Sequence, residues 1–235
     1  MAHIVRLYVD HPLGPGQSVP AGRDDANRLF NVMRLSVGAE VRLFNGSAGE
    51  WRARVAEAGK RGGVLVCEDQ TAPQRIPPDL WLLFAPIKKD RTDFIVEKAT
   101  ELGAARIMPV GTEFTQSDRL RRDRLQAHAV AAAEQCGGTY VPEVAELQKL
   151  SSVLDNWPAD RHLMFCDEAA EAGALPDDRG PWGIIIGPEG GFSDTERECL
   201  RAMGHTVSLG PRILRADTAA VSAMTLWQAK LGDWS

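Results

Sequence analysis

WGIIIGPEGGFSDTERE, residues 182–198, is the stretch that decides the fold. It begins with the apolar run WGIII, and a strand without polar interruption is typical of a parallel sheet buried on both faces. The segment from Gly187 to Gly191 holds three glycines and a proline, so the backbone can turn tightly there and approach a ligand closely. Ser193 and Glu196 have the spacing of a capping box, which predicts a helix start. The stretch therefore predicts a strand, a glycine loop and a helix.

The same alternation of strands and helices extends over the C-terminal two thirds of the chain. Apolar runs predict strands at 80–85, 106–110, 162–166, 182–186 and 207–209. Helices are predicted at 88–102, where Gly103 can cap the end, and at 118–136, 193–203 and 217–231. Apolar strands that alternate with helices predict an α/β domain over 80–235, in which helices cover both faces of a parallel sheet.

The N-terminal part follows a different pattern, in which short strands dominate. Strands are predicted at 4–9, 41–44, 51–55 and 64–67, and Asn45-Gly46 is a strong hairpin signal because both residues tolerate positive φ. One short helix is expected at 24–35. The sequence thus predicts a small β-barrel over residues 1–72, followed by a proline-rich linker at 73–79 that can form neither helix nor ladder.

Composition and charge exclude several classes of protein. Hydrophobic residues at 44% and charged residues at 25% are ordinary for a globular chain. The net charge of −5 argues against binding nucleic acid by bulk electrostatics, although residues 1–76 carry 10 Lys and Arg against 8 Asp and Glu. The first ten residues lack a signal-peptide pattern and no apolar run reaches membrane-spanning length, which predicts a cytoplasmic protein. Four isolated cysteines and scattered histidines predict reduced thiols and no metal site.

A second loop of interest is Leu209-Gly-Pro-Arg-Ile-Leu-Arg215, which also joins a predicted strand to a helix, with Asp217 as the expected N-cap. Two such loops at the carboxyl ends of neighbouring strands are expected to converge on one crevice, where α/β sheets bind ligands. Arg215 stands just before a helix, where the dipole disfavours a cation, so it is a candidate functional residue. The alternatives are plain tight turns and a surface Arg215 paired with Asp217.

Other nucleotide-binding signatures are missing from the chain. Phe192 precedes Ser193 where a Walker A loop needs lysine, and no GxGxxG occurs, so neither a nucleoside triphosphatase nor a dinucleotide-binding domain is indicated. A third segment, Glu134-Gln-Cys-Gly137, ends the predicted long helix, and a helix terminus with a glycine stop is its simplest explanation.

The segments IKKDRTDFIVEKATELGAARIMPV, AAEQCG, IGPEGGFSDTERE and LGPRILRADTAA, in this order and spacing, resemble the RsmE family of 16S rRNA uridine-N3 methyltransferases of the SPOUT class. VRLYV and NVMRLSVGAEVRLFNG are similar to the PUA-like RNA-binding domain of that family, so the resemblance covers almost the whole chain. The chain differs from the family pattern in three places: Gly138 stands where arginine is common, Asp217 where glutamate is usual, and Glu113-Phe114-Thr115 where Glu-Arg-Ser is frequent.

The resemblance implies S-adenosylmethionine as cofactor, 16S rRNA in the small ribosomal subunit as substrate, a deep trefoil knot and a homodimer with active sites at its interface. The cofactor-binding residues that it implies are Phe165, Gly187, Pro188, Glu189, Gly190, Gly191, Leu209, Gly210, Ile213 and Leu214. Our hypothesis for catalysis is that Arg215, helped by Arg6, stabilises the charge that develops on uracil as N3 loses its proton. RNA contacts are expected from Arg6, Arg34, Arg119 and Arg122.

Several alternatives stay open at the level of sequence. Glu189 and Asp217 are candidate general bases, but Glu189 could serve only to order its loop, and Asp217 only to cap its helix. The chain could instead be another SPOUT enzyme, such as a ribose 2′-O-methyltransferase. It could also be a non-catalytic RNA-binding factor in ribosome assembly. Nucleoside analysis of the methylated RNA and titration with the cofactor distinguish these functions.

Overall fold

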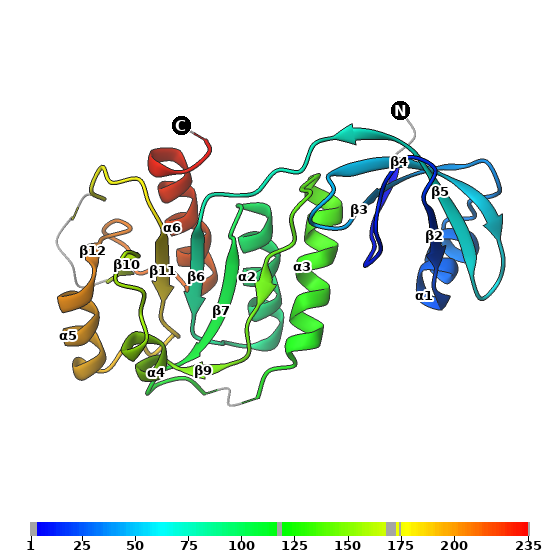
Figure 1. Ribbon diagram of the computed structural model, residues 1–235. Helices are drawn as coiled ribbons and strands as arrows, with labels where there is room; N and C mark the ends of the chain where they lie inside the picture. Colours follow the sequence, from blue (N-terminus) through cyan, green and yellow to red (C-terminus); the bar gives the residue numbers. More distant parts are fainter. Residues whose placement is uncertain (1–3, 117–118, 168–172, 174, 235) are drawn as a thin grey trace. The chain divides into compact units, whose positions relative to one another are not determined.

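The computed structural model describes residues 4–116, 119–167, 173 and 175–234, and the chain divides into two compact units. Unit 1 consists of residues 1–76 together with 133–140, and unit 2 of residues 77–132 and 141–235. Figure 1 shows strands and a short helix in unit 1, and a sheet flanked by helices in unit 2. No described helix is long and apolar enough to cross a membrane.

Unit 1 is built on a five-stranded mixed sheet. Its strands are β1 (Val5–Tyr8), β2 (Ser18–Ala21), β3 (Glu40–Phe44), β4 (Glu50–Ala58) and β5 (Gly63–Ala72), in the order β1-β3-β4-β5-β2. Strands β1 and β3 are parallel, and the other pairs are antiparallel. The predicted hairpin at Asn45-Gly46 is confirmed: it joins β3 to β4, Gly46 has φ of +80°, and the Asn45 carboxamide accepts backbone N–H groups of Ser47 and Ala48.

The helical segment of unit 1 is less regular than the sequence predicts. In place of one helix at 24–35 there is a single turn, α1 (Arg23–Ala26), which passes into a π-helical segment, η1 (Asn27–Val32). Arg34 follows with φ of +57°, a left-handed conformation that residues with a side chain rarely adopt. Strand β2 was not predicted, because Pro20 interrupts its short alternating pattern.

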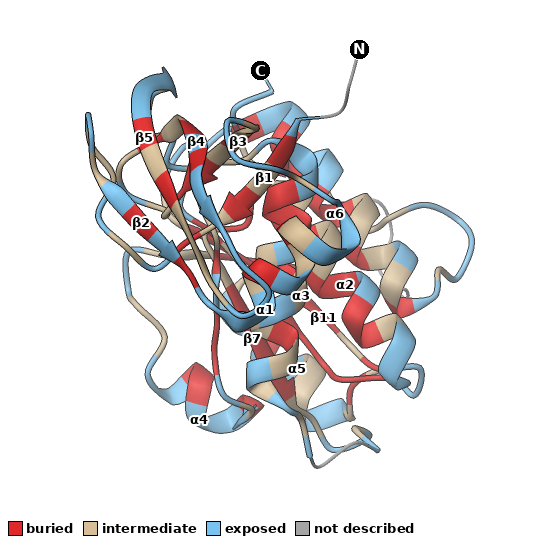
Figure 2. Ribbon diagram, turned by 90° about the vertical axis from the view of Figure 1, so that its right-hand side faces the viewer, coloured by how far each residue is buried: buried red, intermediate tan, exposed pale blue. Residues whose placement is uncertain are grey.

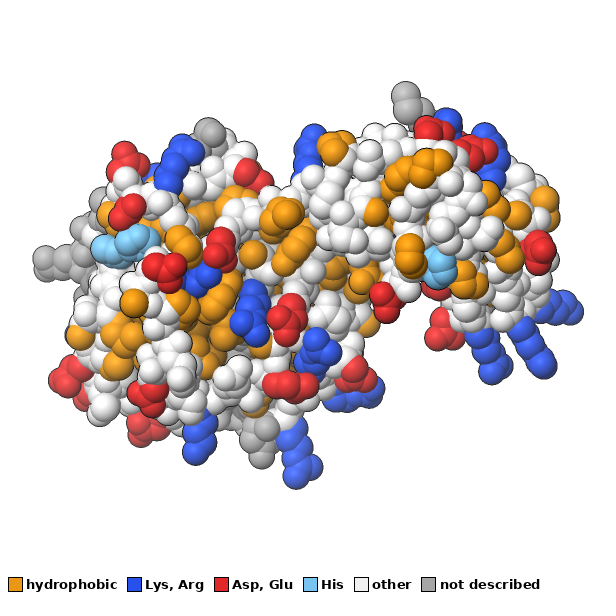
Figure 3. Space-filling model, viewed as in Figure 1, with side chains coloured by type: hydrophobic (Ala, Val, Ile, Leu, Met, Phe, Trp, Pro, Cys, Tyr) orange, Lys and Arg blue, Asp and Glu red, His pale blue; other side chains and the backbone are white. Residues whose placement is uncertain are grey.

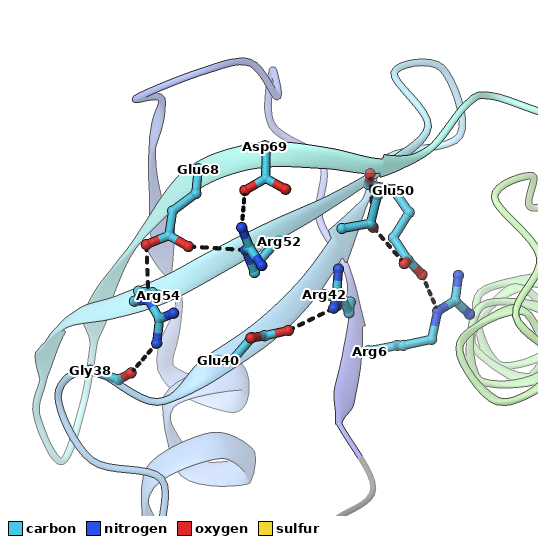
Figure 4. A network of polar contacts seen from close by, with 10 residues as sticks. Arg6, Gly38, Glu40, Arg42, Glu50, Arg52, Arg54, Glu68 and Asp69 are labelled. Atoms are coloured by element: carbon cyan, nitrogen blue, oxygen red, sulfur yellow. Dashed lines mark hydrogen bonds and ion pairs between the residues drawn. The ribbon is translucent and has the colours of Figure 1, made fainter.

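Alternation along the strands of unit 1 places one set of side chains in a core and the other on the opposite face. Leu7, Leu43, Val55 and Leu65 are buried in the same cluster, and Figure 2 shows the resulting succession of buried and less buried residues on β2 and β5. The opposite face carries the charged network of Figure 4, in which arginines of β3 and β4 pair with acidic side chains of β3 and β5. The period-two pattern of the sequence therefore separates a hydrophobic core from a charged face.

Unit 2 contains a seven-stranded sheet whose main path has the order β12-β10-β11-β6-β7-β8, with β9 paired to β7. The strands are β6 (Leu80–Phe84), β7 (Arg106–Gly111), β8 (Glu143–Val144), β9 (Gln148–Lys149), β10 (His162–Cys166), β11 (Trp182–Ile186) and β12 (His205–Val207). Every pair is parallel, as predicted. The short strands β8 and β9 were not predicted, because two residues leave no periodic signal.

The described residues of unit 2 form five helices beside this sheet: α2 (Lys89–Glu101), α3 (Arg122–Cys136), α4 (Leu150–Asp155), α5 (Asp194–Met203) and α6 (Ala216–Leu231). Residues 133–136, the last turn of α3, belong to unit 1. Helix α3 begins at Arg122 and not at the predicted 118; residues 117 and 118 lie outside the described part of the chain. Residues 73–79, between β5 and β6, contain neither helix nor strand.

The parallel strands of unit 2 are buried on both faces. Leu82 and Ile184 point into one hydrophobic cluster, which includes residues of α2 and α6. Leu83 and Ile185, their neighbours along the chain, point into a second cluster with residues of α4 and α5. This is the reason for the uninterrupted apolar runs, because a strand with two covered faces has no solvated side for polar residues.

Candidate functional site

A pocket of about 340 Å³ lies in unit 2 where β10, β11 and β12 end. The three strands lie side by side in the order β12-β10-β11. The two predicted loops follow β11 and β12, which lie on either side of β10. The residues that line the pocket are Cys166, Asp167, Ile186, Gly187, Pro188, Glu189, Gly190, Gly191, Phe192, Leu209, Gly210, Arg212, Ile213, Leu214, Arg215, Ala216 and Ala219. Its size is that of a small-molecule site, and the predicted convergence of Gly187 and Gly210 is confirmed.

The first wall of the pocket is the loop between β11 and α5, and it requires glycine. A Cβ atom on Gly187 would lie 2.7 Å from a ring carbon of the buried Phe192, and Gly191 has φ of +71°. The capping box is present: the Ser193 N–H donates to Glu196 at 2.9 Å, and the Ser193 hydroxyl accepts the Glu196 N–H. The helix start is thereby fixed directly behind the loop.

The second wall is the loop between β12 and α6. Gly210 has φ of +107°, and its N–H donates to the Ser208 hydroxyl at 3.3 Å. The Ile213 side chain is 86% exposed although it is large and apolar. Strand β12 ends at Val207, two residues earlier than predicted, since the loop must leave the sheet to reach the pocket.

Arg215 lies at the N-cap of α6, exposed, on the lining of the pocket. It makes no ion pair with any residue in the described part of the chain. The prediction that Asp217 is the N-cap is wrong, because α6 begins at Ala216. The Asp217 carboxylate instead pairs with Arg91 of α2, so the alternative of an Arg215–Asp217 pair is also wrong. The guanidinium of Arg215 is therefore available to a ligand.

Asp167 is a buried carboxylate at the pocket that the sequence analysis missed. Its side chain has no exposed surface, and its oxygens accept hydrogen bonds from Arg197 at 2.5 Å and from Arg201 at 2.5 Å. Arg197 also donates to the carbonyl of Phe192 at 3.1 Å. The ion pair between Asp167, directly after β10, and Arg197 of α5 thus orders the end of the glycine loop. An acidic residue directly after a buried strand was the signal that could have revealed it.

Phe165 is not among the lining residues, although its neighbours Cys166 and Asp167 are. The ring of Phe165 is fully buried and packs edge to face on Phe192, with 5.4 Å between the ring centroids. Phe165 itself supports Phe192, and through it the position of Gly187.

Cys166 is expected to resist alkylation, because burial raises the pKa of its thiol to about 12. Only the thiolate is a good nucleophile, so at pH 7 to 8, below the pKa of an unperturbed thiol, the rate should be about a thousandfold lower than for such a thiol. The measurement is a time course with iodoacetamide at pH 7 to 9 and mass spectrometry of each peptide. The exposed Cys136 and Cys199 serve as internal controls. Labelling of Cys166 as fast as of these two would contradict the expectation.

Arg6 lies in unit 1, where its guanidinium is surrounded by protein acceptors. It donates to the Glu50 carboxylate at 2.7 Å and to the carbonyls of Ala133, Glu134 and Gly138 at 2.6, 2.9 and 2.8 Å. Figure 4 shows Arg6 and Glu50 turned toward each other at the edge of the charged face. These contacts join β1 to the segment 133–140, which gives Arg6 a structural role within unit 1.

The Glu134 to Gly137 segment has the structural role that the sequence favoured. Gly137 has φ of +84° and ends α3. The Glu134 carboxylate, only 7% exposed, accepts the Tyr8 N–H at 3.0 Å and pairs with Arg28 at 2.7 Å. The motif therefore anchors the last turn of α3 within unit 1.

The arginines that were expected to contact RNA differ in their surroundings. Arg34 in unit 1 and Arg119 in unit 2 are exposed. Arg122 is half-buried and donates to the Val144 carbonyl at 2.9 Å. Figure 3 shows basic and acidic side chains interspersed on the visible face of unit 2. No group of three His, Cys, Asp or Glu side chains placed to hold a metal occurs among the described residues.

Comparisons with known proteins cover both units. A family model described as an RNA methyltransferase domain matches residues 74–228, and one described as an RNA methyltransferase PUA domain matches residues 22–66. The ribosomal RNA small subunit methyltransferase E of Rickettsia conorii is 30% identical over 231 residues, which cover 93% of each protein.

Two solved structures have a closely similar fold. The crystal structure of a ribosomal RNA small subunit methyltransferase E from Neisseria gonorrhoeae, bound to S-adenosyl methionine, has a TM-score of 0.89 and 29% identity. A Legionella pneumophila methyltransferase in complex with the same cofactor has a TM-score of 0.89 and 28% identity. Each match covers 99% of this chain and 100% of the other.

Proposed function

The chain belongs to the ribosomal RNA small subunit methyltransferase E family, and from this membership we propose that it transfers a methyl group from S-adenosylmethionine to N3 of a uridine in small-subunit 16S rRNA. The observation that carries the proposal is the pocket at the ends of β10, β11 and β12, framed by the two glycine loops. The relatives from Neisseria gonorrhoeae and Legionella pneumophila that share this fold are bound to the same cofactor.

The residues of the pocket fit S-adenosylmethionine. The loops at 187–191 and 209–214 would hold it, because glycines let the backbone approach a ligand closely, and Leu209 and Leu214 offer apolar surface to an adenine ring. Ile213 is exposed on the same lining and would be covered by a ligand. When bound, the cofactor supplies a methyl group made electrophilic by its positive sulfur.

The uracil acceptor explains the need for a free arginine. N3 of uracil carries a proton at neutral pH and lies inside any base pair, so the nucleotide must be unpaired or flipped out. When the proton leaves, negative charge spreads over the two carbonyl oxygens, and a nearby guanidinium stabilises it. Arg215 suits this role because it lines the pocket and has no ion-pair partner among the described residues.

The remaining candidates are assigned from their contacts. Arg6 is assigned to holding the segment 133–140, and not to catalysis, because its donors already face protein acceptors. Asp217 is set aside as a base because it is paired with Arg91. Glu189 stays the candidate base, since it is exposed and lines the pocket. The exposed Arg34 and Arg119 are assigned to the RNA backbone.

The resemblance of the sequence to the SPOUT class extends the proposal to assembly and location. We infer a trefoil knot around the 209–215 loop and a homodimer that brings two subunits to each active site. The substrate is inferred to be rRNA within the small ribosomal subunit, which places the enzyme in the cytoplasm. The division into residues 1–72, 73–79 and 80–235 is kept as the functional organisation, with RNA binding in the first part and methyl transfer in the last.

The test is to incubate the purified protein with small ribosomal subunits that lack the modification and with labelled S-adenosylmethionine, and then to map the methylated nucleoside. The expected product is N3-methyluridine at one site. A methyl group on a ribose O2′ would make the chain a different SPOUT enzyme. No measurable binding of the cofactor would instead indicate a non-catalytic RNA-binding factor.

A further inference from the structure

A short turn after β7 presents an aromatic side chain beside the pocket. The turn spans Thr112 to Thr115 and is closed by three contacts: the Thr115 N–H donates to the Thr112 carbonyl at 3.1 Å, the Thr112 N–H donates to the Thr115 hydroxyl at 2.8 Å, and the two hydroxyls lie 2.9 Å apart. The Glu113 N–H donates to the Glu196 carboxylate at 2.9 Å. Because Glu196 also accepts from Ser193, one carboxylate links this turn to the start of α5.

The aromatic residue of the turn is Phe114, and it lies against the glycine loop of the pocket. A Cβ atom on Gly190 would be 3.1 Å from the Phe114 Cβ and 3.5 Å from its first ring carbon, so the absence of a side chain at Gly190 makes room for Phe114. Gly190 itself lines the pocket. Phe114 is nevertheless 44% exposed, so much of the ring is open to solvent. The structure therefore holds an aromatic face beside the pocket without burying it.

We propose that Phe114 stacks on the nucleobase that is presented to the pocket, and so positions the acceptor uridine. The inference rests on the proposed methylation of RNA, and it adds a residue that recognises the base. A base taken out of its helix loses its stacking partners, and proteins replace these partners with aromatic side chains. The turn suits this role because its hydrogen bonds fix the backbone in advance, so that ordering the ring on binding costs little conformational freedom.

The first experiment compares variants of Phe114 in the methylation of RNA. Phe114→Ala is expected to raise the KM for RNA by about 5- to 150-fold, the range for the loss of one stacked base, and to leave the Kd for S-adenosylmethionine unchanged. Phe114→Trp should restore the KM, because it restores an aromatic face. Phe114→Leu should not, although it is apolar. This contrast separates stacking from a structural role that any apolar side chain could fill.

The matched control is Phe94→Ala. Phe94 is also a partly exposed phenylalanine of unit 2, at 39%, but it lies on α2 and does not line the pocket. Its replacement should leave the KM for RNA unchanged. If Phe114→Ala and Phe94→Ala have the same small effect, the stacking proposal is overturned while the methyltransferase assignment stands.

A second experiment reads the contact directly and does not depend on turnover. A single-stranded RNA with one 5-iodouridine in place of uridine is bound to the full protein, and the complex is irradiated. The cross-linked peptide is then identified by mass spectrometry. The cross-link is expected on Phe114. A cross-link on Phe114 without methylation would keep the stacking inference and overturn the proposed reaction. Methylation with the cross-link on another residue would overturn the stacking inference and keep the proposed reaction. If neither methylation nor a cross-link on Phe114 is found, the stacking inference and the proposed reaction are both overturned.

Discussion

The Arg215→Ala variant is expected to lose about 100- to 1,000-fold in kcat for RNA methylation, the loss seen when a group that stabilises developing charge is removed. Its affinity for S-adenosylmethionine should stay close to that of the unaltered protein, because the Arg215 guanidinium makes no hydrogen bond or ion pair with the described residues of the loops at 187–191 and 209–214. The measurement combines single-turnover methylation of small subunits with a calorimetric titration of the cofactor.

The neighbouring Arg212 provides a matched control, since it is also exposed and also lines the pocket. Arg212→Ala should reduce kcat far less than Arg215→Ala, because α6 begins directly after Arg215 and fixes the backbone at that residue. Equal losses in the two variants would show that only the total positive charge matters. Normal turnover by Arg215→Ala would remove Arg215 from the mechanism.

The expected result for Asp167→Ala is a loss of about 3 kcal/mol in the free energy of unfolding, the lower end of the range for a broken buried ion pair. The loss is large because Arg197, only 16% exposed, would be left without this acceptor. It is not larger because Arg201 is 47% exposed and can be solvated. Urea unfolding followed by circular dichroism measures the change. The affinity for the cofactor should also fall, because Asp167 lines the pocket.

Asp69→Ala is the control for this prediction. Asp69 also pairs with an arginine, Arg52, at 2.5 Å, but the two side chains are 53% and 37% exposed. Solvent screens such a pair, so its loss should lower the free energy of unfolding far less than the loss of Asp167 does. If Asp167→Ala unfolds at the same urea concentration as Asp69→Ala, the buried pair does not hold the pocket together.

Sequence patterns predicted best those elements whose signals are local. The strand β11, the loop at 187–191 and the helix α5 follow one another as predicted, because an apolar run, a set of glycines and a capping box each act within a few residues. The Asn45-Gly46 hairpin is predicted for the same reason. The start of α3 and the π-helical segment η1 were missed, because packing overrides weak helical propensity at such positions.

By itself the sequence determined the type of each major element and the identity of the two glycine loops, since periodicity, capping and glycine conformations are properties of neighbouring residues. The tertiary structure alone decided that β10 separates the strands leading to these loops, that Asp167 is buried between two arginines, and that Arg6 binds a segment 127 to 132 residues away. These features depend on contacts between distant parts of the chain, for which no local pattern exists. The same physical reason explains Phe114, whose position beside Gly190 arises only when the ends of β7 and β11 meet at one edge of the sheet.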